Sequence, residues 1–302
     1  MPEAPEAIRR LAEERAQRRA AEEYEAADAL RERISAAGYR VVDHPDGSFE
    51  LSREEPAQTR RVGPESVRSV LTEPPTADWS IHWLHEGWAE DILRGTSSFR
   101  RQAGARRLHQ VVVESVPTAP GTWPGDVEIL PLDRDPGFGA ARNAGLRRSR
   151  GRLVAVVDGS VEPTGDVLAP LEGALADPAV GVAGPVTAVT EDLREFREAT
   201  GPEVDVVEAY LMAFRREILD AGVSFDPHYR FYRAADVDLC FQVKARGLRV
   251  VRADVPMRRH EHRAWAAVPP DRREALSRRN FYRFLGRFRG RTDLLAGGPP
   301  KG

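Results

Sequence analysis

Acidic residues follow four of the predicted strands in this sequence, and they are the first candidates for chemistry. At or just beyond the end of an extended run lie Glu86, Glu114, Asp133 and Asp158. In open α/β sheets, ligands bind in the crevice outside the carboxyl ends of the strands. One acid at such a point is usually a turn former or a helix cap, but four of them predict a site for hydroxyl groups, base edges or a metal ion.

Two glycines and an arginine stand where a helix is predicted to begin after Asp133. Gly137 and Gly139 open this helix, and Arg142 follows within its first turn. Backbone N–H groups at a helix N-terminus, together with an arginine, can cradle an anion. The motif is not the dinucleotide fingerprint, because Arg142 occupies the place of the third glycine. We therefore expect an anion to bind beside the start of this helix. Taken alone, the Gly-x-Gly motif is a weak signal.

A second group of candidates lies in the C-terminal half of the chain. Asp236 and Asp238 stand at the start of a predicted helix, where a carboxylate either stabilises the helix or accepts a proton from a substrate. We favour catalysis for Asp236 and capping for Asp238. His260 and His262 lie two residues apart on an extended segment and so point to the same side. Either or both could bind a metal ion, and the alternative is a pair of surface histidines.

Alternating strands and helices are predicted to position these residues. The sequence predicts helices at 89–102, 139–149 and 165–176, and strands at 80–85, 108–113, 127–132, 153–157 and 180–186. Continuous apolar strands that alternate with helices are typical of a mostly parallel sheet covered on both faces. The predicted fold class is therefore α/β.

The N-terminal residues form a separate small unit in this prediction. Residues 4–37 have the periodicity of two helices, and the strands 39–43 and 48–51 flank a Pro-Asp-Gly turn at 45–47. We expect an appendage at 1–55, a linker at 56–77 with one short helix at 64–71, and a main domain at 78–268. Residues 269–302 are expected to form a basic amphipathic helix and a disordered tail.

Composition limits the classes of protein to which the chain could belong. Its 302 residues carry 45 basic and 47 acidic side chains, a net charge of −2, which does not favour a nucleic-acid binder. The sequence has neither a run long enough for a membrane span nor a signal peptide, so we expect a cytoplasmic protein. The single cysteine, Cys240, cannot form an intrachain disulfide, and its helical spacing from neighbouring apolar residues predicts a core position.

The C-terminal helix allows two interpretations. Eight arginines accompany Leu276, Phe281, Phe284, Leu285 and Phe288 within residues 272–291. Such a helix could lie on an anionic membrane, close to a lipid-linked acceptor. Alternatively, its aromatic face packs on the main domain, which we favour because a helix of this size normally buries its apolar stripe within its own domain.

The ordered series of motifs resembles family 2 glycosyltransferases of the GT-A fold. PGFGAARNAGLRRSRGRLVAVVDGSVEP is similar to that family's Gly-x-x-x-Ala-x-Asn-x-Gly helix and to the apolar strand that leads into Asp-x-Asp. VEAYLMAFRREIL and the residues up to MRRHEH are similar to its Arg-Arg strand end, its Glu-Asp-x-Asp-Leu helix and its late His. The resemblance covers roughly residues 79–288. It implies a Rossmann-like, mostly parallel sheet that binds a nucleotide-diphospho-sugar.

The resemblance also implies roles for donor-binding and metal-binding residues. Asp158 matches the first acid of Asp-x-Asp, which holds the metal or the donor ribose, but Ser160 replaces the second acid. A hydroxyl is a poor substitute for a carboxylate on a hard cation, so Mn²⁺ or Mg²⁺ is expected to bind weakly without the donor. Glu114 matches the acid that recognises the nucleotide base, and Arg142 faces the nucleotide and diphosphate. Glu86 lies in the first donor loop, where the family usually has Pro-x-x-Asn.

The catalytic base and the remaining metal ligands follow in the same way. Asp236 matches the general base of inverting members, whereas Ala235 replaces the glutamate that precedes it. His260 and His262 fall near the late His that completes the metal site in some members. The resemblance implies a glycosyltransferase that moves a sugar from a nucleotide-diphospho-sugar to a hydroxyl acceptor, with inversion. The alternative is a catalytically degenerate protein that keeps the fold for binding or as a scaffold.

The N-terminal segment has a resemblance of its own. EERAQRRAAEEYEAADALRERISAAGYRVVDHPDGSFEL resembles the C-terminal end of bacterial cysteinyl-tRNA synthetases over about 50 residues. The chain lacks that enzyme's His-x-Gly-His and Lys-Met-Ser-Lys-Ser signatures and is not a synthetase. A module that contacts RNA is one interpretation, but 14 acidic against 9 basic residues in 1–55 oppose it. We favour a hairpin that docks on a partner or joins two copies of the chain.

Overall fold

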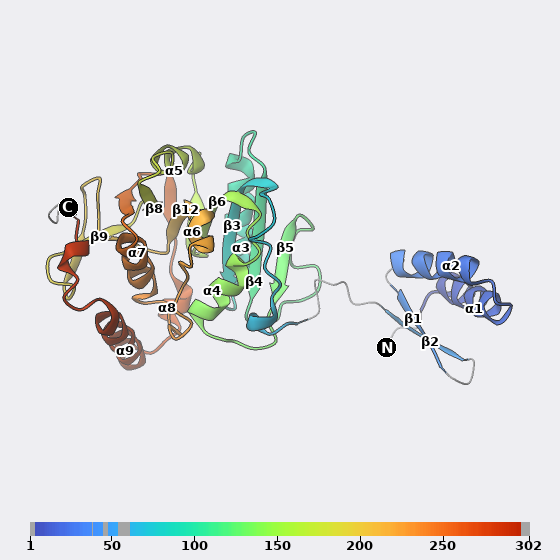
Figure 1. Ribbon diagram of the computed structural model, residues 1–302. Coiled ribbons are helices and arrows are strands. Elements are labelled where there is room, and N and C mark those ends of the chain that lie inside the picture. The colour runs from blue at the N-terminus through green and yellow to red at the C-terminus, as the bar shows by residue number, and fades with distance from the viewer. Residues whose placement is uncertain (1–3, 38, 45–47, 54–60, 297–302) are drawn as a thin grey trace. The chain divides into compact units, whose positions relative to one another are not determined.

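The chain divides into two compact units. The computed structural model describes residues 4–37, 39–44, 48–53 and 61–296. Residues 1–60 form the first unit and residues 61–302 the second, and each is described by itself (Figure 1).

The first unit is a helix pair with a β-hairpin, as the sequence predicts. Its elements are α1 (Glu6–Ala20), α2 (Tyr24–Ala36), β1 (Tyr39–Asp43) and β2 (Phe49–Arg53). The predicted turn at 45–47 lies outside the described residues. Ala12, Ile34 and Val41 form the small core, and Arg15 is buried beside it. The guanidinium of Arg15 donates to both oxygens of Asp43, at 2.7 and 2.9 Å, so this face of α1 is held by an ion pair as well as by apolar contacts.

A seven-stranded sheet is the centre of the second unit. Its order is β13-β8-β12-β6-β3-β4-β5, and β12 runs antiparallel to both of its neighbours while the other pairs are parallel. The strands are β3 (Ala77–His85), β4 (Leu108–Glu114), β5 (Val127–Pro131), β6 (Gly151–Val157), β8 (Val180–Gly184), β12 (Leu211–Arg215) and β13 (Arg249–Arg252). The predicted α/β class with a mostly parallel sheet is confirmed.

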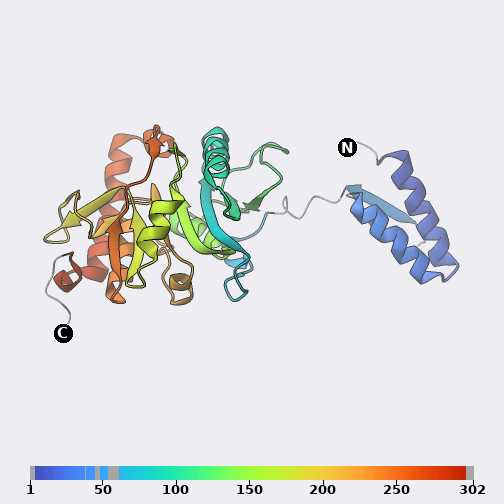
Figure 2. The same ribbon diagram turned by 90° about the horizontal axis from the view of Figure 1, so that it is seen from above.

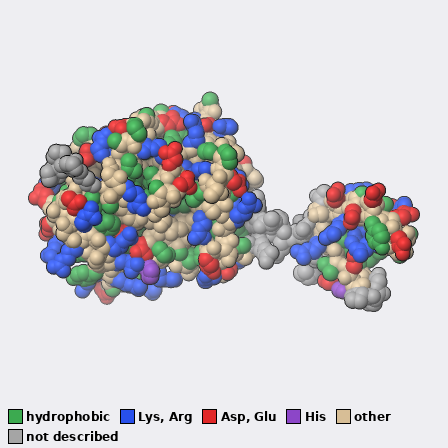
Figure 3. Space-filling model, in the orientation of Figure 1, with side chains coloured by type: hydrophobic (Ala, Val, Ile, Leu, Met, Phe, Trp, Pro, Cys, Tyr) green, Lys and Arg blue, Asp and Glu red, His purple; other side chains and the backbone are tan. Residues whose placement is uncertain are grey.

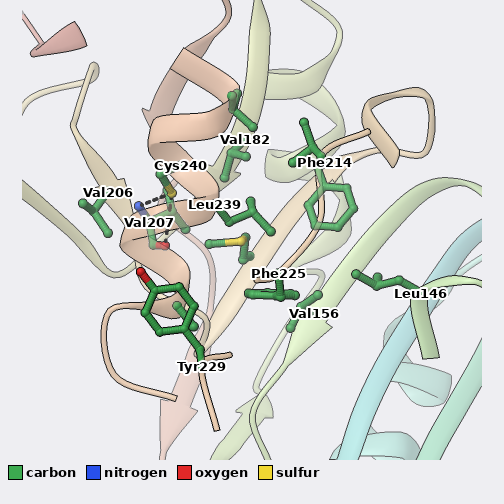
Figure 4. Close-up of a cluster of buried hydrophobic side chains, with 14 of the residues drawn as sticks. Leu146, Val156, Val182, Val206, Val207, Phe214, Phe225, Tyr229, Leu239 and Cys240 are labelled. Carbon is green, nitrogen blue, oxygen red and sulfur yellow. Dashed lines mark hydrogen bonds between the residues drawn. The ribbon is translucent and has the colours of Figure 1, made fainter. Parts of the chain in front are cut away.

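Helices cover both faces of the sheet because successive strand residues point in opposite directions (Figure 2). On β6, Val154 and Val156 face one core, and Ala155 and Val157 face the other. The first core is covered by α4 (Phe138–Leu146), α7 (Ala235–Ala245) and α9 (Pro270–Phe288), and the second by α3 (Ala89–Gln102) and α5 (Leu168–Leu175). Figure 4 shows the first core where α7 meets the sheet.

Short elements complete the second unit. The hairpin strands β9 (Thr187–Thr190) and β10 (Phe196–Glu198) join β11 (Val206–Val207) in a small antiparallel sheet, and β7 (Val161–Pro163) pairs with β14 (Met257–Arg259). The remaining helical segments are α6 (Glu217–Asp220), α8 (Arg263–Ala266) and the 3₁₀ turns η1 (Pro64–Ser66) and η2 (Thr292–Leu294).

Residues 61–77 pack on the sheet. The predicted helix at 64–71 is reduced to η1, because the next residues turn inward and bury Val67 and Val70 instead of continuing a helix. Val62 forms a bridge with Leu132 beyond the end of β5. The second unit thus begins well before the first long strand.

The aromatic face of α9 packs within the second unit. Phe284 is fully buried against Phe241, and Phe288 is 6% exposed. This is the arrangement that we favoured for residues 272–291. Arg283 and Arg287 also face the domain, where they donate to Asp226 and Asp238. Beyond α9, Leu294 of η2 is also buried, and residues 297–302 of the predicted tail lie outside the described residues. Within the described part of the chain, no helix is both long enough and apolar enough to cross a bilayer.

Candidate active site

A cavity of about 450 Å³ opens beside the carboxyl ends of β3 and β6. Its ionisable lining comes from the loops after β3 and β6, the first turns of α4 and α7, the segment after β11, and the residue before α8. These side chains include Glu86, Arg142, Asp158, Glu208, Asp236 and His262. The fold therefore brings five of the predicted site residues to one cavity, as the topology of parallel strands leads us to expect.

Arg142 is a buried cation in the wall of this cavity. It is 4% exposed, and its two terminal nitrogens donate to the carbonyl oxygens of His82 and Val157, both at 3.1 Å. The guanidinium therefore joins the ends of β3 and β6. Its Nε has no hydrogen-bond partner within the described residues, and burial lowers the pKa of Arg142 below its ordinary value. The charge of this buried cation in the cavity wall favours an anion in the cavity.

Asp158 follows β6 and is partly open to the cavity. Its Oδ1 accepts hydrogen bonds from the backbone N–H of Ser160, at 2.9 Å, and from the Ser160 hydroxyl. Its Oδ2 lies 3.4 Å from Nε2 of His262. Ser160 thus takes the place of a second acid by acting as a donor to the first. Asp158 keeps one oxygen that faces His262 and the cavity.

His262 is held between two tyrosines. Its ring stacks on Tyr232 at 4.7 Å and meets the edge of Tyr210 at 5.7 Å. The backbone N–H of Trp265 donates to Nδ1 at 3.1 Å, so in the neutral ring Nε2 carries the proton toward Asp158. Nε2 can bind a metal ion only in the other neutral tautomer, in which Nδ1 carries the proton and no longer accepts from Trp265.

Asp236 and Asp238 have different surroundings although they are two residues apart. Asp236 lines the cavity, where its oxygens accept from the backbone N–H groups of Ala209 at 3.2 Å and Val237 at 2.9 Å. Burial raises its pKa above the ordinary value. Asp238 is fully buried and does not cap α7 as predicted: it accepts from Tyr229, from Gln242 and from Arg287 of α9. The turn before α7 points Asp238 into the core, so its charge is compensated there instead.

Two further carboxylates line the cavity. Glu86 is exposed to the cavity yet lies deep among protein atoms, and this loss of solvation raises its pKa to about 7. Glu208 is half-buried, and its pKa is raised first by burial and then by the negative charge of Asp236. The cavity therefore combines one buried cation with five carboxylates, because Glu274 of α9 also lines it. The lining also includes three exposed arginines, Arg194, Arg233 and Arg278.

The other predicted residues lie outside the cavity lining. Glu114 is buried and accepts from Arg61 at 3.1 Å, from Trp123 at 3.0 Å and from the Thr118 hydroxyl. His260 lies 2.7 Å from Glu162, where β14 pairs with β7. Asp133 forms a surface ion pair with Arg134. The sequence predicts that His260 and His262 point to the same side of an extended segment. In the structure His260 contacts Glu162, whereas His262 contacts Asp158.

The glycines at the start of α4 allow close packing of the backbone and do not form the expected anion cradle. The backbone N–H groups of Phe138 and Gly139 donate to the carbonyl oxygens of Arg230 and Tyr229, at 3.1 and 2.9 Å. A Cβ on Gly139 would lie 2.3 Å from the carbonyl oxygen of Asp226. The first turn of α4 is thus occupied by the segment that leads to α7, and this contact sets the position of Asp236 relative to Arg142.

Cys240 occupies the core, as its spacing predicts. It is fully buried on α7, and its sulfur contacts the backbone N and O of Val207 at 3.4 and 3.6 Å (Figure 4). Burial raises the pKa of the thiol to about 12, so it is no nucleophile at neutral pH.

Sequence reasoning missed Glu208, Tyr210 and Tyr232, which also line the cavity. Glu208 and Tyr210 lie between β11 and β12, and Tyr232 lies shortly before α7. Because these positions are far from Asp158 in the sequence, nothing in the sequence indicated that they share its cavity. The sequence signal that could have found these three residues is their position next to an apolar strand or a helix. Many residues with a purely structural role have the same position.

Comparison with known proteins identifies the domain. Residues 108–238, from β4 to the first turn of α7, match the model of the family described as Glycosyl transferase family 2. This part of the chain, which is less than half of it, is therefore similar to family 2 glycosyltransferases. The match includes Asp158 and Asp236. No curated protein matches the chain, and no comparison supports the resemblance of the N-terminal unit to cysteinyl-tRNA synthetases.

Solved structures share the fold of the domain that contains this match. GalNAc-T7 with UDP, GalNAc and Mn²⁺ aligns with a TM-score of 0.55 and 14% identity, over 70% of this chain and 48% of that one. The mannosyltransferase PcManGT from Pyrobaculum calidifontis, with GDP-Man and Mn²⁺, gives 0.52 and 19%, over 76% and 71%. TarS 1–349 from S. aureus, with UDP, gives 0.50 and 16%, over 70% and 66%.

These alignments confirm the GT-A fold. This chain spans about half the length of the GalNAc-T7 chain. At such identities the likeness extends to the fold alone.

Proposed function

We propose that this protein transfers a sugar from a nucleotide-diphospho-sugar to a hydroxyl group, with inversion at the anomeric carbon. One observation carries the proposal: a single cavity of this GT-A domain contains both a buried cation and a partly buried carboxylate. The cation is Arg142, and the carboxylate is Asp236. The solved structures of similar fold with UDP or GDP-Man support the donor class.

The leaving diphosphate would lie near Arg142 and Asp158. Arg142 is held in place by the two carbonyl oxygens, so its charge needs no rearrangement when the diphosphate departs. Glu86 lies in the same wall, and its raised pKa allows a protonated carboxyl to donate a hydrogen bond to the donor near neutral pH. Glu114 contacts the base in this proposal only if Arg61 moves away from it.

Asp236 would act as the general base. The acceptor oxygen forms a bond to the anomeric carbon while the bond to the diphosphate oxygen breaks, and the acceptor proton passes to the Asp236 carboxylate. The backbone N–H groups of Ala209 and Val237 orient this carboxylate. Because burial raises its pKa, ionised Asp236 is a stronger base than an exposed aspartate.

A divalent cation fits the donor end only in part. Within the described residues no group of three His, Cys, Asp or Glu side chains could hold a metal ion. Asp158 offers one carboxylate oxygen, and His262 offers Nε2 only in the tautomer that gives up the hydrogen bond from Trp265. Mn²⁺ or Mg²⁺ would therefore require oxygens from the donor diphosphate as well, and it would neutralise the charge that develops there.

Replacing Ser160 tests the metal site. Ser160→Asp adds a carboxylate beside Asp158 and removes the hydroxyl that donates to it. We expect Mn²⁺ to bind this variant more tightly than the wild type in the absence of nucleotide, as measured by calorimetry. Because Ser160 is buried, the metal-free variant should also melt at a lower temperature. Equal affinity for Mn²⁺ in both proteins would place the ion elsewhere.

A second candidate function is binding without catalysis. Glu114, the expected base-recognising acid, is already held by Arg61, Thr118 and Trp123. Ser160 and Ala235 also stand where the family has acids. A degenerate protein that keeps the fold as a scaffold would bind no nucleotide diphosphate, whether or not Mn²⁺ is present.

One donor screen separates the two candidates. UDP, GDP and their sugars are added with and without Mn²⁺, and the melting temperature is recorded. A ligand at 100 times its Kd should stabilise the protein by about 2.7 kcal/mol. Sugar transfer or donor hydrolysis is then measured for each ligand that binds. Binding followed by turnover supports the enzyme, and a protein that no nucleotide stabilises contradicts it.

An RNA-associated function has less support. On the face of the second unit seen in Figure 3, acidic side chains are interspersed among the arginines. Nucleic-acid binding normally needs a continuous basic surface. Salt-dependent binding of tRNA by the full chain would revive this alternative.

A further inference from the structure

Glu208 is a cavity carboxylate to which the proposed mechanism assigns no role. It follows β11, and its own backbone N–H donates to the carbonyl oxygen of Val186 at 2.8 Å. The next N–H, of Ala209, donates to the Asp236 carboxylate at 3.2 Å. Glu208 and Asp236 therefore belong to adjoining walls of the same cavity, joined through one peptide group.

The backbone beneath Glu208 is firmly held. The sulfur of Cys240 contacts both the N and the O of the preceding residue, Val207, and so fixes β11 against α7 (Figure 4). Val206 and Val207 are both buried. Because the backbone is fixed on both sides, Glu208 presents its carboxylate at a defined place in the cavity wall.

The charge of Glu208 is poorly compensated. Within the described residues its carboxylate has neither a hydrogen-bond donor nor an ion-pair partner. Asp236 disfavours its ionised form, and the positive charges of Arg233 and Arg259 favour it from farther away. A half-buried carboxylate without donors costs folding free energy, and a ligand that supplies donors removes this cost. Two neighbouring carboxylates suit an acceptor that carries hydroxyl groups.

Aromatic side chains line the same cavity. Tyr210, Tyr232, Phe196 and Phe281 contribute to its wall. Tyr232 is held by stacking on His262, and Tyr210 by the guanidinium of Arg259, 3.8 Å from its ring centre. Flat aromatic surfaces pack against the C–H faces of a sugar ring, while carboxylates accept hydrogen bonds from its hydroxyls. This combination matches a carbohydrate better than an alkyl chain.

We propose that Glu208 binds the acceptor, and that the acceptor is a sugar with two neighbouring hydroxyl groups. One hydroxyl faces Asp236 and attacks the donor. The adjacent hydroxyl donates to Glu208 and thereby fixes which oxygen reaches the base. This inference rests on the proposed glycosyl transfer and adds to it the class of acceptor and the residue that selects it.

Matched ring compounds test the role of Glu208. The probes are cyclohexanol and trans-1,2-cyclohexanediol, which differ by the second hydroxyl, and the methyl glycosides of glucose, galactose and mannose. Binding to the nucleotide-loaded full chain is followed by NMR titration, and transfer by mass spectrometry. We expect the wild type to prefer the diol by about 10- to 100-fold, the effect of one charge-assisted hydrogen bond. At least one methyl glycoside should bind more tightly than the diol.

Variants separate acceptor binding from a structural role. In Glu208→Ala the preference for the diol over cyclohexanol should fall to about one, and Glu208→Gln should keep part of it. A structural role would weaken both probes equally and leave their ratio unchanged. Glu195→Ala is the control, because Glu195 is an exposed glutamate in the turn between β9 and β10 and is absent from the cavity lining.

The outcomes distinguish this inference from the proposed function. An unchanged ratio in Glu208→Ala, no preference for the diol in the wild type, or no binding of any ring compound overturns the role of Glu208. Donor binding is measured separately by calorimetry with UDP- and GDP-sugars. If no donor binds, the proposed function fails, whatever the ring compounds do.

Discussion

Asp236 and Asp238 illustrate how two similar residues are given different tasks. Both are withdrawn from solvent at the start of α7, and the pKa of both is raised by burial. Asp238 is surrounded by donors from Tyr229, Gln242 and Arg287, so its lone pairs are used within the protein. Asp236 accepts only from backbone N–H groups and still lines the cavity. Only Asp236 is placed to receive a proton from a substrate.

Replacing each aspartate should therefore affect a different property. Asp236→Asn keeps the shape but cannot accept the acceptor's proton, so we expect kcat to fall by about 10²–10⁴-fold. Its melting temperature should be no lower than that of the wild type, because the variant buries no charge. Asp238→Ala should instead cost about 1–3 kcal/mol of stability by leaving the buried hydroxyl of Tyr229 without its acceptor. Turnover and melting curves of both variants check this, and near-normal transfer by Asp236→Asn would refute the base.

The pH dependence of transfer follows from the direction of the pKa shift. A base must be ionised, and the pKa of Asp236 lies above that of an ordinary aspartate. As the pH falls, kcat/KM should therefore decline at a higher pH than an exposed aspartate would require. A pH–rate profile measured with saturating donor tests this. A decline that begins only near pH 4 would indicate that the essential carboxylate is well solvated.

At the scale of elements, the contact between α4 and the segment before α7 sets the geometry of the site. Arg142 lies on α4 and Asp236 on α7, and the two helices meet where Phe138 and Gly139 donate to the carbonyl oxygens of residues 230 and 229. The side chain of Asn143 reinforces this contact, because it donates to the carbonyl oxygen of Phe225 and accepts from its N–H. The distance between Arg142 and the proposed base depends on this contact.

Widening that contact should impair both stability and transfer. In Gly139→Ala the new Cβ would lie 2.3 Å from the carbonyl oxygen of Asp226, so the backbone must move apart. We expect a loss of about 1–3 kcal/mol and a lower kcat. The control is Gly173→Ala on α5, where a Cβ meets nothing within 4 Å. That change should stabilise the helix by about 0.5–1 kcal/mol. Urea unfolding of both variants gives the comparison, and equal stabilities would contradict this view of the contact.

At the scale of the whole molecule, the division into two units predicts separable roles. Each unit has a core of its own, and every residue of the cavity lies in the second. Deleting residues 1–60 should therefore leave a folded domain with the same nucleotide affinity and kcat as the full chain. Calorimetry and circular dichroism of the truncated protein test this. An insoluble product or a lost nucleotide site would show that the first unit completes the second.

The sequence by itself determined the elements and their order. Apolar runs and helical spacing predicted β3, β4, β5, β6 and β8 and three helices to within a few residues, because each run buries its own side chains whatever its neighbours are. The strand ends carrying Glu86 and Asp158 and the helix start carrying Asp236 were found in the same way. Parallel strands bring such ends to one edge of the sheet, so their convergence on a cavity was predictable.

Only the tertiary structure decided which polar residues remain available to a ligand. Glu114 follows its strand as predicted, yet Arg61, 53 residues earlier in the chain, takes up its carboxylate. His260 contacts Glu162 of β7, whereas His262 contacts Asp158 in the loop after β6. Glu208 lies near Asp236 because β11 packs on α7. A local pattern specifies the backbone, but hydrogen-bond partners come from distant segments, so the state of each side chain is fixed only when these segments meet.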